Sequence, residues 1–400
     1  MTSAASTTTS PELLRSSSSK WTNWFIRTKS AAVLVAIVGG CVAAGHFGVM
    51  LLNTIIQALL FHELISLRQH DRQSDRSSHR SDEEDHETAE IVNLQPWYQW
   101  AWFALAHYLV TGLVLFSRFS LDESMGTIFT FLMRYHMLIS FLAACFLFVY
   151  FIATLTPPYW PKIKSLFWTL IVILLIYGTT GPILSPLMDG LFWYIFPTIL
   201  IAINDTAAYI SGFFFGKHQL CQISPKKTIE GALGAFIVTI IVSYFLAGWM
   251  SNFPFVVCPK SELSLTPLVE CSPDPVFLLK KYTIPYLNYE FVTKPIQLHG
   301  LFYGLFASSI APFGGLFASA IKRALKIKDF SALIPGHGGV ADRVDCQVFM
   351  LLFSTVWYST FIKPYNVSYI SYYSQYLPMK EQVALFEILQ RRLRAGGYPV

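Results

Sequence analysis

One stretch of the chain, residues 231–250, "GALGAFIVTIIVSYFLAGWM", contains no charged side chain. A helix of this length is about 30 Å long, which matches the thickness of the hydrocarbon core of a bilayer. The stretch therefore predicts a membrane-spanning helix. Similar apolar runs recur along most of the 400 residues, so the chain is expected to cross the membrane many times.

The composition of the chain agrees with many such spans. Hydrophobic residues make up 54% of the sequence and charged residues 13%, with a mean hydropathy of +0.47, whereas soluble domains carry about 25% charged residues. We therefore exclude a soluble globular protein and expect an all-α, polytopic integral membrane bundle of about eight to ten transmembrane helices. The other runs expected to span the bilayer are 97–116, 136–155, 166–184, 191–215, 298–321 and 344–362.

The first part and the end of the chain have less regular patterns. Residues 1–29 are rich in Ser and Thr and mostly basic, which predicts a disordered cytosolic tail. Residues 31–62 are too long for one ordinary span and contain glycine breaks, so a tight hairpin or one long, kinked helix would fit. Residues 68–95 carry charges of both signs and predict a solvated linker. Residues 376–400 predict an amphipathic helix, on the membrane surface or packed on the bundle, followed by a short tail.

Basic residues in the second half predict the orientation. Residues 216–227 and 321–328 are both basic, which places them on the cytosolic side. Residues 251–297, between the two flanking spans, are then a lumenal loop. Cys258 and Cys271 share this loop and could form a disulfide if it faces an oxidising compartment.

The segment least like the rest of the chain is residues 326–345, "KIKDFSALIPGHGGVADRVD", which holds six formal charges between apolar runs. If the preceding helix continues for another turn, one of its faces carries a hydroxyl and three cations. These residues are Ser319, Lys322, Arg323 and Lys326. Cations that snorkel at the end of a membrane helix are the alternative, but the further charges of the segment favour a functional site.

Glycines and aspartates follow these cations. The glycines around His337 allow positive φ, so that backbone N–H groups could form an anion nest. Asp342 and Asp345 are three residues apart and would project from one face of the next helix. A helix cap would also explain Asp342, but a carboxylate that enters an apolar span, such as Asp345, indicates a functional site.

Two earlier segments supply residues of the same kind. "INDTAAYISGFFFG", residues 203–216, places Asn204 and Asp205 in an apolar run, where a carboxylate needs a partner. "SPKKTIEG", residues 224–231, combines two lysines with hydroxyl and acidic side chains at the start of a span. A basic cytosolic turn with a Thr–Glu capping arrangement would also account for the second segment.

These residue types together indicate a class of chemistry. Lys and Arg suit phosphate oxygens, and Asp suits Mg²⁺, which bridges phosphates more often than it occupies an all-protein cage. We therefore expect phosphoryl or nucleotidyl transfer at the cytosolic membrane surface, chemistry that depends mainly on positioning and charge neutralisation.

The charged segment resembles the signature of phosphatidate cytidylyltransferases, the CDP-diacylglycerol synthases, at every position of the pattern. The matching residues are Ser319, Lys322, Arg323, Lys328, Asp329, Ser331, Pro335, His337, Gly338, Gly339, Asp342, Arg343 and Asp345. Residues 204–216 and 224–231 also resemble blocks of this family. The two-cysteine loop and "WTNWFIRT", residues 21–28, are similar to its eukaryotic branch.

The resemblance implies that CTP and phosphatidic acid react to give CDP-diacylglycerol and pyrophosphate, with Mg²⁺ as the cofactor, in a catalytic domain over residues 30–375 with its signature region at 319–345. The catalytic residues it implies are Asp342, Arg343, Asp345, Lys328, Asp329 and His337. The Mg²⁺ ligands would come from Asp342, Asp345, Asp205 and Asp329. The substrate-binding residues would be Ser319, Lys322, Arg323, Ser224, Lys226, Lys227, Thr228, Glu230, Gly338, Gly339 and Asn204. For His337, the roles of hydrogen-bond donor, acid and structural residue all stay open.

Two other functions fit parts of the pattern. A CTP-dependent polyprenol or phytol kinase also uses a membrane-embedded nucleotide site. A transporter would also place acids in apolar spans, although transporters more often show internal repeats, which we do not find in this sequence.

The resemblance also implies partners and a location. The expected partners are CTP, phosphatidic acid and membrane lipids, without nucleic acid, and a homodimer is left open. We expect the membrane of the endoplasmic reticulum. A mitochondrial or plastid membrane is the alternative, because the N-terminus is Ser-rich, basic and poor in acids.

Overall fold

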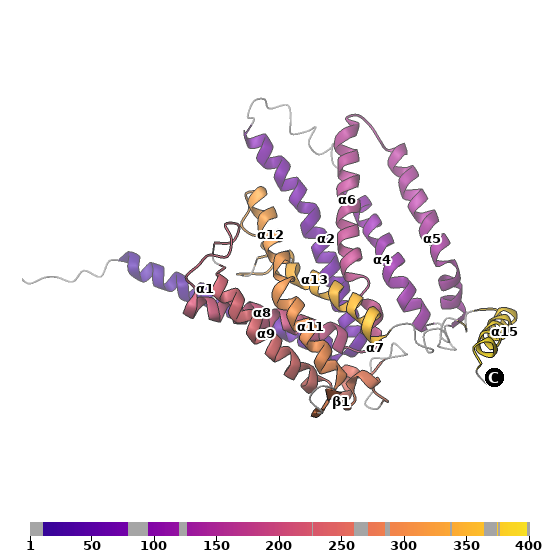
Figure 1. The fold of residues 1–400 in the computed structure, drawn as a ribbon. Helices are drawn as coiled ribbons and strands as arrows, with labels where there is room; N and C mark the ends of the chain where they lie inside the picture. The colour runs from indigo at the N-terminus through magenta and orange to yellow at the C-terminus, as the bar shows by residue number, and fades with distance from the viewer. Residues whose placement is uncertain are drawn as a thin grey trace, which may run out of the picture. The chain divides into compact units, whose positions relative to one another are not determined.

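The computed structural model describes residues 11–78, 95–119, 126–225, 227–259, 271–284, 289–336, 338–363, 374 and 377–397. Its contacts divide the chain into two compact units, residues 1–355 and 356–400. The longer helices of the first unit are α1 (Pro11–Ala43), α2 (Gly45–Ser78), α4 (Pro96–Phe119), α5 (Gly126–Ala153), α6 (Tyr159–Thr180), α8 (Phe192–Phe215), α9 (Ile229–Met250), α11 (Pro295–Ser309) and α12 (Pro312–Ala324) (Figure 1). The short α7 (Leu184–Asp189) precedes α8, and α13 (Ala341–Trp357) leads into the second unit, which holds the π-helical turn η2 (Tyr358–Ile362) and α15 (Met379–Ala395).

Seven helical segments among the described residues are long and apolar enough to cross a bilayer. They are Gly45–Leu67, Pro96–Phe116, Phe131–Ala153, Tyr159–Asp189, Phe192–Phe215, Ile229–Met250 and Pro295–Ala324. The all-α, polytopic membrane bundle is therefore confirmed, with fewer candidate spans than the predicted number. The expected span 344–362 accounts for part of this difference, because α13 has only 17 residues and begins with three charges in the sequence "ADRVD".

The apolar stretch 31–62 forms two helices. The chain turns at Ala44 and Gly45, where Gly45 has a φ of 73°, a left-handed conformation that glycine adopts without strain. Helix α1 begins at Pro11 and thus includes much of the predicted N-terminal tail, and α2 continues to Ser78, into the predicted linker. Neither segment contains an internal proline that would stop the helix earlier.

Helix α9 packs against α8 and α11 through a stripe of small residues. The stripe recurs every fourth residue and consists of the buried Gly231, Ala235, Thr239, Ser243 and Ala247. Thr239 donates a hydrogen bond to Asn204 of α8 (3.2 Å), and a Cβ at Gly304 of α11 would lie only 2.9 Å from the Ser243 Cβ. Small residues let membrane helices approach closely, because lipid tails provide no hydrophobic drive for their association.

Helices α2, α4 and α6 form a second group, in which α5 packs against α4 (Figure 1). The ring of Phe61 in α2 lies 4.7 Å from that of Phe103 in α4, measured between centroids, and Phe103 also contacts Tyr177 of α6. The Trp168 indole of α6 donates a hydrogen bond to the Leu64 carbonyl (3.1 Å). These contacts fix the second half of α2, which reaches the functional site.

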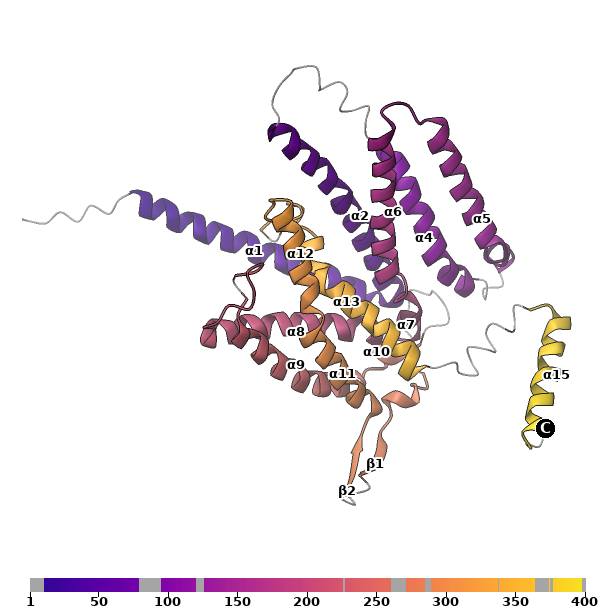
Figure 2. The same cartoon turned by 45° about the horizontal axis from the view of Figure 1, so that its top comes forward.

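The loop between α9 and α11 has a structure of its own. A disulfide joins Cys258 and Cys271, so the pairing left open by the sequence is formed. The strands β1 (Lys280–Ile284) and β2 (Tyr289–Thr293) pair in antiparallel fashion and extend as a hairpin (Figure 2). We did not predict this hairpin, although "KKYTI" and "YEFVT" are rich in β-branched and aromatic residues.

The expected span 298–321 is a discontinuous helix. Helix α11 ends at Ser309, and α12 starts at Pro312, a residue well suited to the first turn of a helix. The prediction that Lys326 continues the cationic face of α12 is wrong. Lys326 has a φ of 55°, and the Ile327 amide donates to the Lys322 carbonyl (2.9 Å), which closes the end of the helix.

Candidate active site

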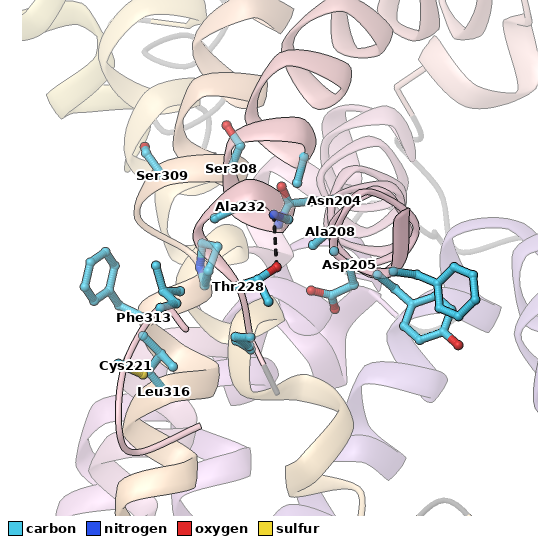
Figure 3. A pocket seen from close by; sticks show the side chains of 18 residues that line it. Asn204, Asp205, Ala208, Cys221, Thr228, Ala232, Ser308, Ser309, Phe313 and Leu316 are labelled. Atoms are coloured by element: carbon cyan, nitrogen blue, oxygen red, sulfur yellow. Dashed lines mark hydrogen bonds between the residues drawn. The ribbon is translucent and has the colours of Figure 1, made fainter. Parts of the chain in front are cut away.

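A cavity of about 680 Å³ lies between α8, α9 and the junction of α11 with α12. Most of its wall is apolar, and the polar side chains of Asn204, Asp205, Lys227 and Thr228 line one part of it. Figure 3 shows the Asp205 carboxylate directed toward Thr228. The cavity thus combines an apolar surface with charged groups, as a site for an amphipathic substrate requires.

The loop before α9 positions the cavity lysine. The Leu220 amide donates to the Lys227 carbonyl (2.8 Å), and the Ile229 amide donates to the His218 carbonyl (2.9 Å), so the loop folds back on itself. The Thr228 hydroxyl accepts from the Gly231 amide (3.1 Å) and caps α9.

Glu230 and Ser224, which were also predicted for the site, have local contacts near this loop. Glu230 does not complete the Thr–Glu capping arrangement but accepts hydrogen bonds from the Lys217 and His218 amides (3.0 and 3.2 Å). Ser224 is half-buried, and its carbonyl accepts from the Lys227 amide (3.1 Å). Lys226 lies outside the described residues.

Asp345 of α13 reaches the same region as Lys227. A Cβ at Gly315 of α12 would lie 3.3 Å from the Asp345 Oδ2 and 3.5 Å from the Lys227 Nζ. The missing side chain of Gly315 therefore leaves room for these charges to approach each other. Asp205 interacts electrostatically with both of them. Three residues that the sequence predicts for the site, from helices α8 and α13 and the loop before α9, are thus brought together.

Asp342 has a different environment, because each of its oxygens has a partner within the protein. Its Oδ1 accepts from the Lys322 Nζ (2.6 Å), in an ion pair whose side chains are 5% and 18% exposed. Its Oδ2 accepts from the amides of Phe330 and Gly339 (3.0 Å each). These bonds close the segment between α12 and α13 into one structural unit.

A residue that we did not predict completes this unit. Glu63 of α2 is 1% exposed, and its carboxylate accepts from the Ser331 hydroxyl (2.6 Å) and from the amides of Val340 and Ala341 (2.8 Å each). Glu63 is the only Asp, Glu, Lys or Arg residue in the span Gly45–Leu67. A buried acid in an apolar span was the signal that could have identified it.

The remaining predicted residues have simpler surroundings. Arg323, Lys328, Asp329 and Arg343 are exposed, and the Ser319 hydroxyl donates to the Gly315 carbonyl (2.7 Å). His337 lies outside the described residues. The amides of Gly338 and Gly339, expected to bind phosphate, donate to the Ile334 carbonyl and to Asp342 in this structure. Their role toward a substrate stays a prediction.

The aspartate carboxylates of the site are the candidate ligands for Mg²⁺. Among the residues that the structure describes, no group of three or more His, Cys, Asp or Glu side chains could hold an ion. Mg²⁺ is usually bound by one or two carboxylates together with substrate phosphates. Asp205, which lines the cavity, and Asp345, which lies near Lys227, fit an ion of that kind.

A cavity between membrane helices that joins apolar walls to a carboxylate and a lysine suits a membrane-embedded transferase that acts on phosphate groups. The model of the cytidylyltransferase family matches residues 25–361. The chain belongs to this family and is an enzyme of the nucleotidyltransferase class.

Curated relatives from several eukaryotes support this membership. Phosphatidate cytidylyltransferase 1 of Arabidopsis thaliana is 35% identical over 396 residues, which covers 96% of this chain and 90% of the relative. Phosphatidate cytidylyltransferase 1 of Homo sapiens is 32% identical over 404 residues, covering 97% of this chain and 84% of the relative. The phosphatidate cytidylyltransferase of Caenorhabditis elegans is 32% identical over 395 residues, covering 94% and 80%.

Proposed function

We infer that this chain transfers the cytidylyl group of CTP to phosphatidic acid and releases CDP-diacylglycerol and pyrophosphate. The observation that carries this proposal is a cavity with largely apolar walls that is lined by Asp205 and Lys227, with the carboxylate of Asp345 close to Lys227. The names of the relatives agree with the same reaction.

The chemistry of the two substrates explains why charged groups are needed at the end of membrane helices. The phosphate monoester of phosphatidic acid has a second pKa of about 6 and is largely dianionic at neutral pH, so it needs little help from a base. One of its oxygens attacks the α-phosphorus of CTP, the bond to the β-phosphate oxygen breaks, and pyrophosphate leaves. Lys227 holds phosphate oxygens near the reacting atoms, and the apolar wall of the cavity accommodates the lipid.

We assign the metal to the carboxylates of Asp205, which lines the cavity, and Asp345, which lies near Lys227. Asp345, together with Asp205, would hold Mg²⁺, which when bound neutralises charge on the phosphates. Asp342 supports the site by holding Lys322 and the amides of Phe330 and Gly339. Removal of divalent metal with a chelator should abolish turnover, and added Mg²⁺ should restore it.

The location of the reaction follows from the substrates and the charge pattern. CTP arrives from the cytosol and phosphatidic acid within the membrane, so the site should open to the cytosolic side. The basic segments 216–227 and 321–328 support this orientation. We propose the endoplasmic reticulum as the membrane.

Labelled CTP separates the proposed reaction from its competitors. Purified protein in liposomes that contain both phosphatidic acid and a polyprenol should incorporate label into lipid from the α-phosphate of CTP and not from the γ-phosphate. An Asp345→Asn variant serves as the inactive control. Incorporation from the γ-phosphate alone would identify a lipid kinase instead, and ion movement without consumption of CTP would identify a transporter.

A further inference from the structure

Glu63 connects the first half of the chain to the signature segment, residues 319–345. It precedes its three partners by 268 to 278 residues. Its side chain is buried, and Phe61, two residues earlier in α2, belongs to the same hydrophobic cluster as Phe330, Val340 and Ala341. No cation is among the hydrogen-bond partners described for this carboxylate, which accepts from one hydroxyl and two backbone amides.

The start of α13 explains why a carboxylate is needed there. The first amides of a helix have no partner within the helix, and a side-chain oxygen of the preceding residue usually accepts from them. The residue before Ala341 is Val340, whose side chain has no oxygen. Glu63 supplies this oxygen from another helix and places a negative charge at the positive end of the helix dipole.

Glu63 and Asp342 divide three consecutive amides between them. The Gly339 amide donates to Asp342, and the next two amides donate to Glu63. Glu63 also lies close to Gly339. A Cβ at Gly339 would lie 2.8 Å from Glu63 Oε2 and 3.0 Å from Ser331 Oγ. The path of residues 339–341 therefore depends on both carboxylates, and Asp345 follows one turn later on α13.

We propose that Glu63 is a positioning residue for cytidylyl transfer, an anionic anchor that holds residues 339–341 so that Asp342 and Asp345 are correctly oriented. The proposal rests on the proposed function and adds to it a residue outside the signature segment. An anchor of this kind is distinguishable from a side chain that only fills space. Gln has the shape of Glu but places an NH₂ group against a backbone N–H, whereas Asp keeps the charged acceptor and is shorter.

The experiment compares Glu63→Gln with Glu63→Asp in the α-phosphate incorporation assay. We expect Glu63→Gln to lower kcat about 100-fold, the order of loss caused by a small misplacement of reacting groups, with KM for CTP changed less than about threefold. Glu63→Asp should lose about tenfold less than Glu63→Gln. The reverse order, with Glu63→Gln close to the wild type, would show that Glu63 only fills space and would overturn the proposal.

A matched control comes from the same helix. Gln57 is fully buried, and its Nε2 donates to the Thr180 hydroxyl (2.8 Å), away from the signature segment. Gln57→Leu should lower thermal stability and leave kcat unchanged. If Gln57→Leu reduces kcat as much as Glu63→Gln at equal loss of stability, the effect of Glu63 is one of general folding, and the proposal fails.

A second pair of variants tests the contact if Glu63→Gln does not fold. Gly339→Ala brings a methyl group against the Glu63 carboxylate and should lower kcat, and Glu63→Asp withdraws that carboxylate. The double variant should therefore lose less activity than the product of the two single losses. Fully multiplicative losses would contradict the anchor. Wild-type protein is assayed in parallel, so absence of α-phosphate incorporation in the wild type would refute the proposed function instead.

Discussion

Asp342 and Asp345 are three residues apart in the sequence, but their oxygens have different surroundings. Asp342 is saturated by Lys322 and two amides. Asp345 accepts from the Cys346 amide with Oδ1 (2.7 Å), while its Oδ2 lies near Lys227 at Gly315. Asp342 thus organises the segment, whereas Asp345 has one oxygen near Lys227.

The ion pair of Lys322 with Asp342 gives the first prediction. Lys322→Met leaves a buried carboxylate without its cation, which should lower the free energy of unfolding by about 3 kcal/mol and reduce turnover. The double variant Lys322→Met with Asp342→Asn removes both charges. It should regain thermal stability in detergent without regaining turnover. Recovery of both properties would mean that the pair has no part in the reaction.

Lys227 at the cavity gives the second prediction. Lys227→Met removes a cation that we place on phosphate oxygens, so kcat/KM for CTP should fall about 100-fold with little change in thermal stability. Lys217→Met is the matched control, because Lys217 is exposed in the same loop and only its backbone amide is bonded to Glu230. Equal losses in the two variants would indicate a general effect of loop charge.

At the scale of the helices, the close packing of α9 with α11 depends on glycine. Gly304→Ala would place a Cβ 2.9 Å from the Ser243 Cβ and 3.1 Å from the Ile240 Cα, so we expect a loss of about 1–3 kcal/mol in stability. Gly178→Ala in α6 is the control, because nothing lies within 4 Å of its new Cβ. It should be neutral or stabilising, since alanine favours helix. Thermal unfolding in detergent measures both, and a stable Gly304→Ala variant would argue against this packing.

Some features of the helices could be predicted from the sequence, and others could not. The uncharged stretch 231–250 predicted α9 because a long apolar run has few other solutions. The end of α12 could not be predicted, because Lys326 adopts a left-handed conformation that is uncommon for a residue with a side chain. Glu63 was missed as well, because its partners are far along the chain and only the tertiary fold brings them to it.

At the scale of the whole molecule, two kinds of segment connect or end the helices. The loop 216–228 and the end of α12 carry the basic residues, while the loop between α9 and α11 carries the disulfide of Cys258 and Cys271. These segments lie at opposite ends of α9 and its antiparallel neighbours. The basic ends should face the cytosol, and the disulfide should face an oxidising lumen.

Cysteine labelling in sealed microsomes tests this orientation. Cys221 is half-buried beside the cavity, so a membrane-impermeant maleimide should modify it from the cytosolic side, in a variant whose other free cysteines are replaced. Cys258 and Cys271 should react only after both permeabilisation and reduction. The double variant Cys258→Ser with Cys271→Ser should lose about 3 kcal/mol of stability and keep its kcat, because the disulfide lies outside the active site. Labelling of Cys258 in intact vesicles after treatment with an impermeant reductant would reverse the orientation and place the cavity away from cytosolic CTP.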